Sequence, residues 1–458
     1  MIENDAFKLL LINLFHLNPD DITNIVCTTF NKMMVLLVTL ADKHQACPYC
    51  GFTAPKIKEY VTKEITHSAL TTQKCIIKYR ARRYKCSCCG KTYYEFNPFV
   101  FKSQKISILT VHNILKDLKD FNETFTSVAR RYHVSPTSVS TIFDNHVDIG
   151  RNPLPEIINF DEVYAFKSEK SKYVCVLLDF KKQIPVDVLP NRKKEYLLNY
   201  FQKIPLEERK KVKYACSDMY EVYRDVVHKV FPESKHLLDY FHLSQDFHKK
   251  MNEVRIKVMK GYKDDKASDE YYLLKKFNWL LFKNPEDEDK YGRLFDVERE
   301  RKYNSHFKSY MNYYDLRKKL LEINNDLTIC YSLKLELVDF YSKSTIDNAQ
   351  VNLEHLIRSF IDTNIEEMIK FSNNLINWKQ EIINSFTIVG TEYKVEADKG
   401  QVVVCNKKVN NAIIENRNKI IKCIKNNANG YTNWSRFRNR VMYVLDPNAT
   451  FSLEPREK

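Results

Sequence analysis

The sequence predicts an α/β core of mixed strand direction, which follows two smaller modules and contains a long helical segment. Three observations support this fold class. Short apolar runs typical of buried strands recur between residues 157 and 238, and amphipathic stretches separate the later ones. Residues 243–385 then lose the strand pattern and become charged and helix-like. Five cysteines gather in two tight groups between residues 46 and 90, so this part of the chain differs from the core.

Length and charge narrow the functional classes. A chain of 458 residues has room for two to four domains. Lys and Arg total 73 against 58 Asp and Glu, which gives a net charge of +15 and favours a polyanionic partner. The longest apolar runs, Leu9–Leu17 and Met33–Leu40, are too short to cross a membrane. We expect an intracellular protein that contacts no membrane, whose cysteines do not form a disulfide framework.

The first 100 residues predict a metal-binding module that begins with a short helix and a strand. Cys47-Pro-Tyr-Cys50 and Cys86-Ser-Cys88-Cys89 are each followed by glycine. Two such knuckles can place four thiolates tetrahedrally around one Zn²⁺, and glycine lets the backbone turn toward the sulfurs. The predicted ligands are Cys47, Cys50, Cys86 and Cys89, because a Cys86/Cys88 pair makes the poorer knuckle. Buried free thiols or a redox pair are the alternatives.

Residues 101–150 predict helices, and residues 125–143 have the pattern of a helix-turn-helix. Ser135 can cap the second helix, with Pro136 at its first position. The apolar positions expected to face inward are Val128, Ala129, Tyr132, Val134, Val139, Ile142 and Phe143. The polar and basic positions expected to contact DNA are Arg130, Arg131, Thr137, Ser138, Ser140 and Thr141. An ordinary pair of antiparallel helices is the alternative interpretation.

Strands and then helices are predicted for the rest of the chain. The predicted strands are Ile157–Phe160, Tyr173–Leu178, Ile184–Leu189, Val212–Cys216 and His236–Leu238, with helices near 193–203 and 219–231. Later helices are predicted at Asp315–Asp326, Glu354–Asn377 and 409–427, the last ended by Gly430. Strands that alternate with helices predict a sheet of mixed direction.

Two aspartates stand at the ends of predicted strands. Asp161 follows Ile157–Phe160, and Asp218 follows the run that ends at Cys216. A carboxylate in such a place pays a desolvation penalty that a divalent cation can offset, and carboxylate oxygens suit Mg²⁺ or Mn²⁺. Glu162 competes with Asp161, but strand alternation points the two side chains to opposite faces.

Six segments resemble those of a known family. They are DEVYAFK at 161–167, YVCVLLD at 173–179, SDMYEVYR at 217–224, PESKHLLDYFH at 232–242, NNAIIENRNKIIK at 410–422 and GYTNWSRFR at 430–438. They are similar to the bacterial insertion-sequence transposases of the ISL-three family, as are the cysteine knuckles and the helix-turn-helix. The resemblance extends over nearly the whole chain, although 250–400 matches mainly in being helical.

The resemblance implies a ribonuclease H-like core with a triad of two aspartates and one glutamate. By motif, Asp161 is the first acid, Asp218 the second and Glu415 the third. Because 197 residues separate Asp218 from Glu415, a helical insertion must lie between them. Asp239-x-x-His242 resembles an accessory motif, in which His242 contacts a phosphate or assists proton transfer. A structural histidine at a helix start is the alternative.

The C-terminal segment is basic and contains aromatic residues. The candidate DNA-contacting residues are Arg417, Lys419 and Lys422 on the helix of Glu415, followed by Arg436 and Arg438. Tyr431, Trp434 and Phe437 are interleaved with these last arginines, a combination that suits a phosphate backbone with unstacked bases. A solvated charged face over an aromatic core is the alternative.

Together these features predict a DNA transposase. The predicted domains are a zinc-binding module at 1–100, a helix-turn-helix at 101–150, a catalytic domain at 151–250 and 400–445, and a helical insertion at 251–399. The transposase would bind the terminal inverted repeats of its element and, with Mg²⁺ or Mn²⁺, cut DNA and join it to target DNA. We expect at least a dimer in the active complex, acting on nucleoid DNA in the bacterial cytoplasm. A domesticated, non-catalytic DNA-binding regulator and a nuclease of the same fold without strand transfer are the alternatives.

Overall fold

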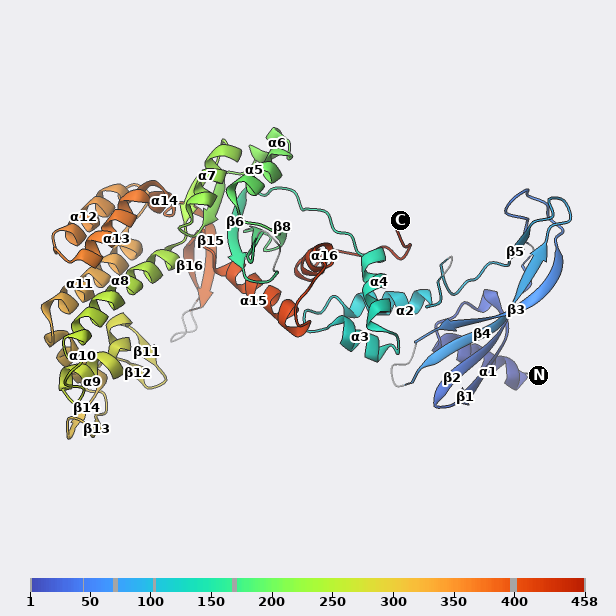
Figure 1. Ribbon diagram of the computed structural model, residues 1–458, viewed down its shortest axis with the longest axis horizontal. Coiled ribbons are helices and arrows are strands. Elements are labelled where there is room, and N and C mark those ends of the chain that lie inside the picture. The colour runs from blue at the N-terminus through green and yellow to red at the C-terminus, as the bar shows by residue number, and fades with distance from the viewer. Residues whose placement is uncertain are drawn as a thin grey trace.

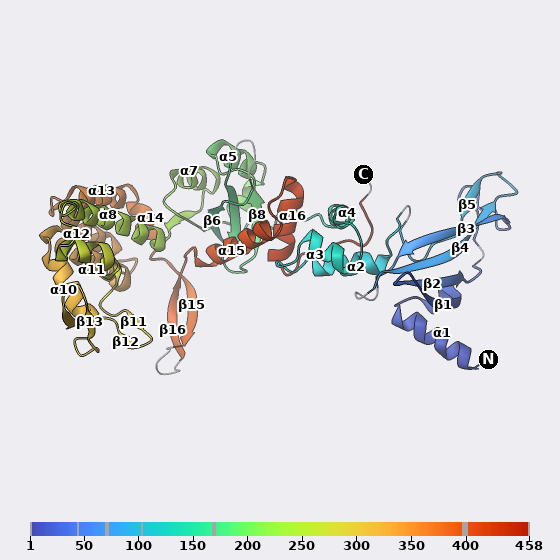
Figure 2. The same cartoon turned by 60° about the horizontal axis from the view of Figure 1, so that its bottom comes forward.

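The computed structural model shows an elongated chain built from three bodies of secondary structure in a row (Figure 1). The N-terminal sheet lies at one end, a helical segment lies at the other, and a five-stranded sheet lies between them, as a second view confirms (Figure 2). The structure describes residues 2–43, 45–68, 73–101, 104–166, 171–395 and 402–456. Among these residues, no helix combines the length and the apolar character needed to cross a membrane.

The N-terminal body is a twisted sheet with one helix against it. Its elements are α1 (Ile2–Leu14), β1 (Ile22–Phe30), β2 (Met33–Leu40), β3 (Lys56–Thr66), β4 (Cys75–Lys85) and β5 (Thr92–Tyr94). The strand order is β1-β2-β4-β3, with β5 paired to β4, and only β2 and β4 run parallel. Buried Ile12 of α1 and Phe15, just after its end, pack on Leu36 and Ile77. The sequence predicted the helix but only one of the two strands in residues 1–45.

Three short helices follow, α2 (Ile108–Asp117), α3 (Phe125–Arg131) and α4 (Pro136–His146). The side chain of Ser135 accepts a hydrogen bond from the amide of Ser138, and Pro136 occupies the first helical position of α4, as predicted. The predicted inward positions Val128, Ala129 and Phe143 are almost completely buried. The local pattern that predicted two helices joined by a tight turn is therefore confirmed.

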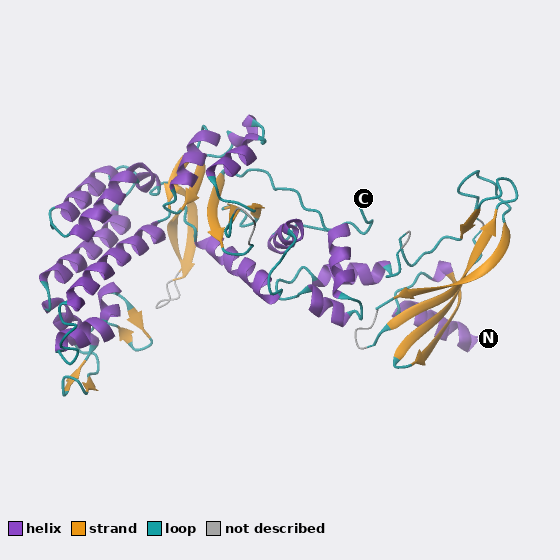
Figure 3. Cartoon of the chain, in the orientation of Figure 1, coloured by secondary structure: helices purple, strands orange, loops and turns teal. Residues whose placement is uncertain are grey.

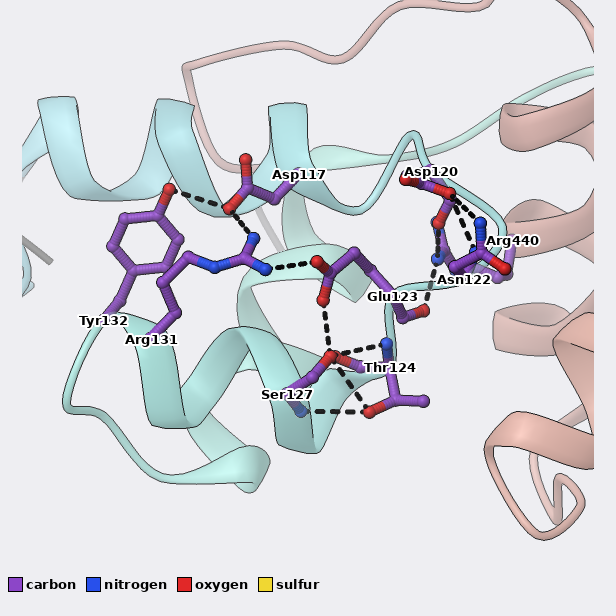
Figure 4. A network of polar contacts seen from close by, with 9 residues as sticks. All are labelled: Asp117, Asp120, Asn122, Glu123, Thr124, Ser127, Arg131, Tyr132 and Arg440. Carbon is purple, nitrogen blue, oxygen red and sulfur yellow. Dashed lines mark hydrogen bonds and ion pairs between the residues drawn. The ribbon is translucent and has the colours of Figure 1, made fainter.

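These helices pack against the last helix of the chain, α16 (Trp434–Leu445). The guanidinium of Arg440 on α16 is buried and donates hydrogen bonds of 2.8 Å to the carbonyls of Asp120 and Glu123 (Figure 4). The hydroxyl of Tyr443 donates to the carbonyl of Leu115 over 3.0 Å. Residues more than 300 positions apart in sequence thus form one packed unit.

The central sheet contains the five predicted strands. They are β6 (Ile157–Val163), β7 (Val174–Asp179), β8 (Pro185–Leu189), β9 (Tyr214–Ser217) and β10 (Lys235–Leu238). The order is β10-β9-β6-β7-β8, with β7 antiparallel to both neighbours and β6, β9 and β10 mutually parallel. The predicted mixed direction is confirmed, and parallel β6 and β9 bring their C-terminal ends to one edge.

Helices cover both faces of this sheet. On one face, Phe160 and other apolar side chains of the strands pack on α5 (Lys194–Gln202) and α7 (Glu221–Val230), near the short α6 (Leu206–Arg209). On the other face, Val163 and Val176 pack on α15 (Ala412–Asn427) and α16. The alternation along β6 therefore decides which acidic side chain reaches α15.

A helical body is inserted between β10 and α15. It contains α8 (Tyr240–Lys260), α9 (Asp269–Lys276), α10 (Tyr313–Glu322), α11 (Asn325–Lys343), α12 (Ala349–Ile361), α13 (Glu366–Asn377) and α14 (Lys379–Asn384). These helices lie together at one end of the molecule (Figure 3) and share one large apolar core. The predicted helical character of 243–385 is confirmed, although the stretches at Asp315–Asp326 and Glu354–Asn377 are each divided between two helices.

Three two-stranded ribbons were not predicted. Two are small, β11 (Glu288–Asp289) with β12 (Gly292–Arg293) and β13 (Lys302–Asn304) with β14 (Ser309–Met311). The third, β15 (Ile388–Val395) with β16 (Val402–Lys408), projects from the molecule just before α15 (Figure 2). The domain boundary predicted at 399/400 lies outside the described residues. The predicted helix at 409–427 is confirmed as α15, and Gly430, at φ 98°, follows its end.

Candidate catalytic site and cysteine cluster

The four predicted thiols form one cluster in the N-terminal body. Their sulfurs all lie within 4.8 Å of one another, with 3.7 Å between Cys47 and Cys89 and 3.5 Å between Cys50 and Cys86. Gly51 and Gly90 adopt φ values of 75° and 70°, which only glycine adopts at little cost. Exposed Cys88 is not part of the cluster. The set has the composition and spacing of a site that can bind zinc.

Asp161 is buried near the end of β6 and faces α15. Its Oδ2 accepts a hydrogen bond of 2.8 Å from Nδ2 of Asn418, and its Oδ1 accepts one of 2.7 Å from the amide of Glu162. Asn418 lies one helical turn after Glu415 on α15, so the helix that carries the predicted third acid also contacts the first. Sequence reasoning missed Asn418, although its i+3 spacing from Glu415 was a readable signal.

Glu162 lies on the opposite face of β6, as strand alternation predicted. Its carboxylate forms an ion pair with Arg192 on the α5 and α7 side of the sheet. The guanidinium of Arg192 also lies 4.8 Å from the ring centre of Tyr220 and 4.6 Å from that of Tyr173. Glu162 is thus part of a polar and aromatic cluster, whereas Asp161 faces α15.

Asp239, His242 and Glu415 come together at the same edge of the sheet. Asp239 follows β10 and begins α8, and its Oδ2 lies 3.0 Å from Nδ1 of His242. Glu415 lies in the first turn of α15, and one ligand atom from each of the three residues lies within 4.8 Å of the others. Asp239 and His242, which the sequence predicted as an accessory motif, therefore lie beside Glu415, the predicted third acid.

A network of asparagines fixes the start of α15 against β6. Nδ2 of Asn159 donates to the carbonyl of Asn410 over 2.8 Å and to Oδ1 of Asn411 over 2.7 Å. Nδ2 of buried Asn411 donates to the carbonyl of Phe160. The backbone amide of Asn411 donates to Oδ1 of Asp239 over 3.5 Å. Because these bonds join β6, β10 and α15, they hold Glu415 in place despite its distance in sequence.

Burial raises the pKa values of the two strand-end aspartates. Burial, assisted by the negative charge of Asp218, raises the pKa of Asp161 to about 7. Burial likewise raises the pKa of Asp218 to about 6, and its buried Oδ1 has no hydrogen-bond partner. The hydrogen bond to Asp239 raises the pKa of His242 despite its burial, and the charges of Asp239, Asp218 and Asp161 act in the same direction. The carboxylates of the site therefore favour a positive charge beside them, and His242 is a group that can carry one.

The polar residues predicted to contact DNA from α4 are partly free. Thr137 and Thr141 are exposed, whereas Ser138 and Ser140 are half-buried and engage Ser135 and the carbonyl of Thr137. On α3, Arg130 is exposed, whereas the side chain of Arg131 is already engaged in ion pairs. The guanidinium of Arg131 pairs with Asp117 and Glu123 (Figure 4).

The basic residues of the C-terminal segment divide into two groups. Lys419 and Lys422 are exposed on α15, and Arg417 donates to the carbonyl of Gln183 over 3.1 Å. Arg436 and Arg438 instead form ion pairs with Asp144 and Asp187 at 2.6 Å and 2.7 Å. The aromatic residues pack together, since Phe437 is fully buried and contacts Trp434, Tyr431 and Phe166. For these aromatics the alternative interpretation, an aromatic core, describes their packing.

Comparison with known proteins identifies the family. A family model described as a transposase, of the ISL-three DDE type, matches residues 158–397, just over half of the chain. The match includes Asp161 and Asp218 and ends before Glu415. The transposase for insertion sequence element IS1001 of Bordetella parapertussis is 19% identical over 410 residues, which cover 89% of this chain and 90% of that relative. The chain therefore belongs to the ISL-three family of DDE DNA transposases.

Proposed function

We propose that the central sheet is a ribonuclease H-like core in which Asp161, Asp218 and Glu415 form the catalytic triad. The strand order is β10-β9-β6-β7-β8, and β7 runs antiparallel to its neighbours whereas the other strands share one direction. This topology supports the assignment. The single observation that carries it is the meeting of α15 with β6, where Asn418 bonds to Asp161. That contact holds α15, the helix of Glu415, against a strand whose acid lies 254 residues before Glu415 in the sequence.

The residues at this edge fit a divalent cation. Asp161 is buried and Asp218 is half-buried, their pKa values are raised, and Oδ1 of Asp218 has no partner. A cation held by Asp161, Asp218 and Glu415 would offset the negative charges of these carboxylates. An all-carboxylate set favours Mg²⁺ or Mn²⁺ over softer metals. Bound there, such a cation supplies Lewis-acid stabilisation to the phosphodiester under attack.

The chain itself supplies a positive group beside the acids. His242 donates from Nδ1 to Asp239, which fixes the ring and leaves Nε2 as the remaining donor. The raised pKa of His242 favours its charged form near neutral pH. We infer that His242 donates to a phosphate oxygen of the bound strand, and that Asp239 holds the ring in the orientation this requires.

Recognition of the element ends is assigned to the N-terminal parts of the chain. We propose that α3 and α4 form a helix-turn-helix, with Thr137 and Thr141 in a major groove and Arg130 against the backbone. The cysteine cluster would hold a structural Zn²⁺ that stabilises the first module. Lys419 and Lys422 would add salt-sensitive contacts. We expect at least two copies in the active complex, which acts on nucleoid DNA in the bacterial cytoplasm.

A cleavage assay on DNA that carries the ends of the element tests the proposal. With Mg²⁺, the wild-type protein should nick at the element end and join the freed 3′-hydroxyl to target DNA. Asp218→Asn and Glu415→Gln should bind the same DNA but cut on the order of 10³-fold more slowly, because each removes one ligand from a site that acts as a unit. Asp225→Asn is the matched control, since Asp225 pairs with Lys194 away from the site.

Two results would contradict the assignment. Normal cutting by Glu415→Gln would mean that the third acid lies elsewhere in the chain. End binding by the wild-type protein with no cutting in Mg²⁺ or Mn²⁺ would favour the alternative of a domesticated, non-catalytic DNA-binding regulator.

A further inference from the structure

A second group of metal-ligating side chains lies away from the catalytic acids. His228 is on α7, His236 is on β10 and Glu381 is on α14. One ligand atom of each lies within 4.8 Å of the others. Oε1 of Glu381 is 3.9 Å from Nε2 of His228 and 3.9 Å from Nδ1 of His236. These separations are too long for hydrogen bonds, so the three side chains face one another without bonding directly.

Hydrogen bonding fixes the tautomer of His236. The hydroxyl of Ser217 donates its only proton to the carbonyl of Asp218 over 2.9 Å. Its oxygen must therefore accept from Nε2 of His236, which lies 2.9 Å away. A neutral His236 then carries its proton on Nε2 and an unshared pair on Nδ1. That pair faces the carboxylate of Glu381, and Nδ1 is buried with no hydrogen-bond partner.

Two acceptors that face each other in a buried place need a positive charge between them. His236 is only 1% exposed, so water has little access to this place. Arg224 is a nearby cation, but its guanidinium is engaged elsewhere. It donates to the carbonyl of Asn377 over 2.9 Å and lies 4.3 Å from the ring centre of Trp378. Within the described part of the chain, Nδ1 of His236 therefore has no hydrogen-bond partner, and a cation bound between Nδ1 and the carboxylate would satisfy both acceptors.

We propose that His228, His236 and Glu381 bind a transition-metal ion of the Zn²⁺ class. Two imidazole nitrogens and one carboxylate oxygen are ligands that Zn²⁺ prefers over Mg²⁺. Ligands held ~2.1 Å from a tetrahedral ion lie ~3.4 Å apart, so separations of 3.9 Å would need to shorten by about 0.5 Å, which side-chain rotation can supply. His228 is exposed on one side, which leaves a fourth position for water.

Such an ion would fasten the helical insertion to the central sheet. Glu381 belongs to the insertion, whereas His228 and His236 belong to the sheet and its helix. Nδ2 of Asn384 also donates to the carbonyl of His236 over 2.9 Å, which shows that the two parts already meet here. Because His236 bonds Ser217, the residue before Asp218, the ion would also steady the strand end that carries the second acid.

Counting zinc in the full-length protein tests this site without any cleavage assay. Protein saturated with Zn²⁺ and then freed of excess should lose one ion per chain in Glu381→Gln relative to Glu366→Gln. Glu366 is the matched control, because it lies on the exposed face of α13 and pairs only with Lys370. Cys50→Ser should lose a different ion, so that the double variant with Glu381→Gln loses two.

A milder variant protects the test against misfolding. His228→Gln changes an exposed side chain, so the protein should fold normally while the ion becomes removable at roughly 10-fold lower chelator concentration. Equal zinc content and equal chelator resistance in wild type, Glu381→Gln and His228→Gln would overturn the proposal and leave a purely polar contact. Loss of the ion in Glu381→Gln with intact cleavage would show that this site is separate from the catalytic triad. Loss of cleavage in that variant with the ion retained would contradict the proposal.

Discussion

Exchange of Asp161 for Asn should stabilise the metal-free protein while it abolishes cleavage. Burial and the nearby charge of Asp218 raise the pKa of Asp161 from 3.8 to about 7. A carboxyl with a raised pKa contributes its full stability below pH ~4 and loses it as the pH rises toward 7. At pH 8 the ionised group then costs the folded state roughly 4 kcal/mol, from ~1.4 kcal/mol per tenfold change in proton affinity.

The amide should recover most of that cost because the site can adapt to it. Asp161 accepts one bond at each oxygen, from Glu162 and from Asn418. An amide accepts at one atom only, but Oδ1 of Asn418 is buried without a partner. Rotation of the Asn418 amide by half a turn presents that oxygen to the new donor. We therefore expect Asp161→Asn to gain ~2–4 kcal/mol at pH 8 and almost nothing at pH 4.

Hydrogen exchange during a urea titration measures the gain where it arises. Peptides spanning residues 157–179 should exchange more slowly in Asp161→Asn than in wild type at pH 8 in magnesium-free buffer. Added Mg²⁺ should protect the wild type more than the variant, and cutting of element ends should fall on the order of 10³-fold.

Glu162→Gln is the neighbouring control for this prediction. It should lose about 1 kcal/mol from its ion pair with Arg192 and keep most of its activity. A variant at Asp161 that is less stable than wild type at pH 8, or that still cuts, would refute the reasoning. Loss of cutting in the control alone would mean that Glu162 is the first acid.

Three further predictions concern the other modules. Cys50→Ser should release one zinc per chain by elemental analysis and unfold the N-terminal module alone, and full zinc content would contradict the site. Thr141→Glu, on the exposed side of α4, should weaken specific binding to the inverted repeat at least ~10-fold in a competition assay and leave nonspecific binding nearly unchanged; an unchanged footprint would remove α4 from the interface. Arg440→Leu removes two bonds of 2.8 Å to the carbonyls of Asp120 and Glu123. It should cost ~3 kcal/mol and make the segment between α2 and α3 sensitive to limited proteolysis, which an intact segment would contradict.

Sequence reasoning located the central strands because each is a short, wholly apolar run. Every residue of β7 and β8 is buried, and a strand covered on both faces reads as such a run. The small ribbons were missed because strands of two or three residues, such as β11, carry no periodicity. The break between α12 and α13 had a local signal, since Asn364 adopts φ 58°, but the charged pattern continued across it.

The candidate site was predictable in its parts rather than in its assembly. Asp161 and Asp218 follow apolar runs, so their strand-end positions could be deduced from the sequence alone. The meeting of Asp239 with Glu415 depends on contacts that span 172 residues or more, such as the bond from Asn411 to Asp239, and no local pattern encodes them. Only family resemblance predicted the place of Glu415.

Arginine shows a further limit of prediction from sequence, because its side chain can equally well contact a DNA phosphate or form an ion pair within the protein. Arg131, Arg436 and Arg438 were all candidates for phosphate contact, and each is paired with a carboxylate in the structure. The partners of Arg436 and Arg438, Asp144 and Asp187, lie more than 250 residues away in the chain, so no local pattern marks these arginines as paired. A basic run therefore indicates a polyanionic partner for the surface as a whole, and not for any one guanidinium.

The C-terminal segment links recognition to chemistry in a single stretch of chain. On α16, Phe437 and Val441 pack on the central sheet, whereas Tyr443 packs among α2, α3 and α4. On α15, just before it, Glu415 lies beside Asp239 and His242, and Asn418 bonds Asp161. Because one helix pair contacts both the proposed recognition helices and the candidate site, DNA bound at α4 would be held in a defined relation to the carboxylates. The long insertion separates Glu415 from Asp218 in sequence, and Glu415, the proposed third acid, lies on the segment that is anchored to the proposed recognition helices.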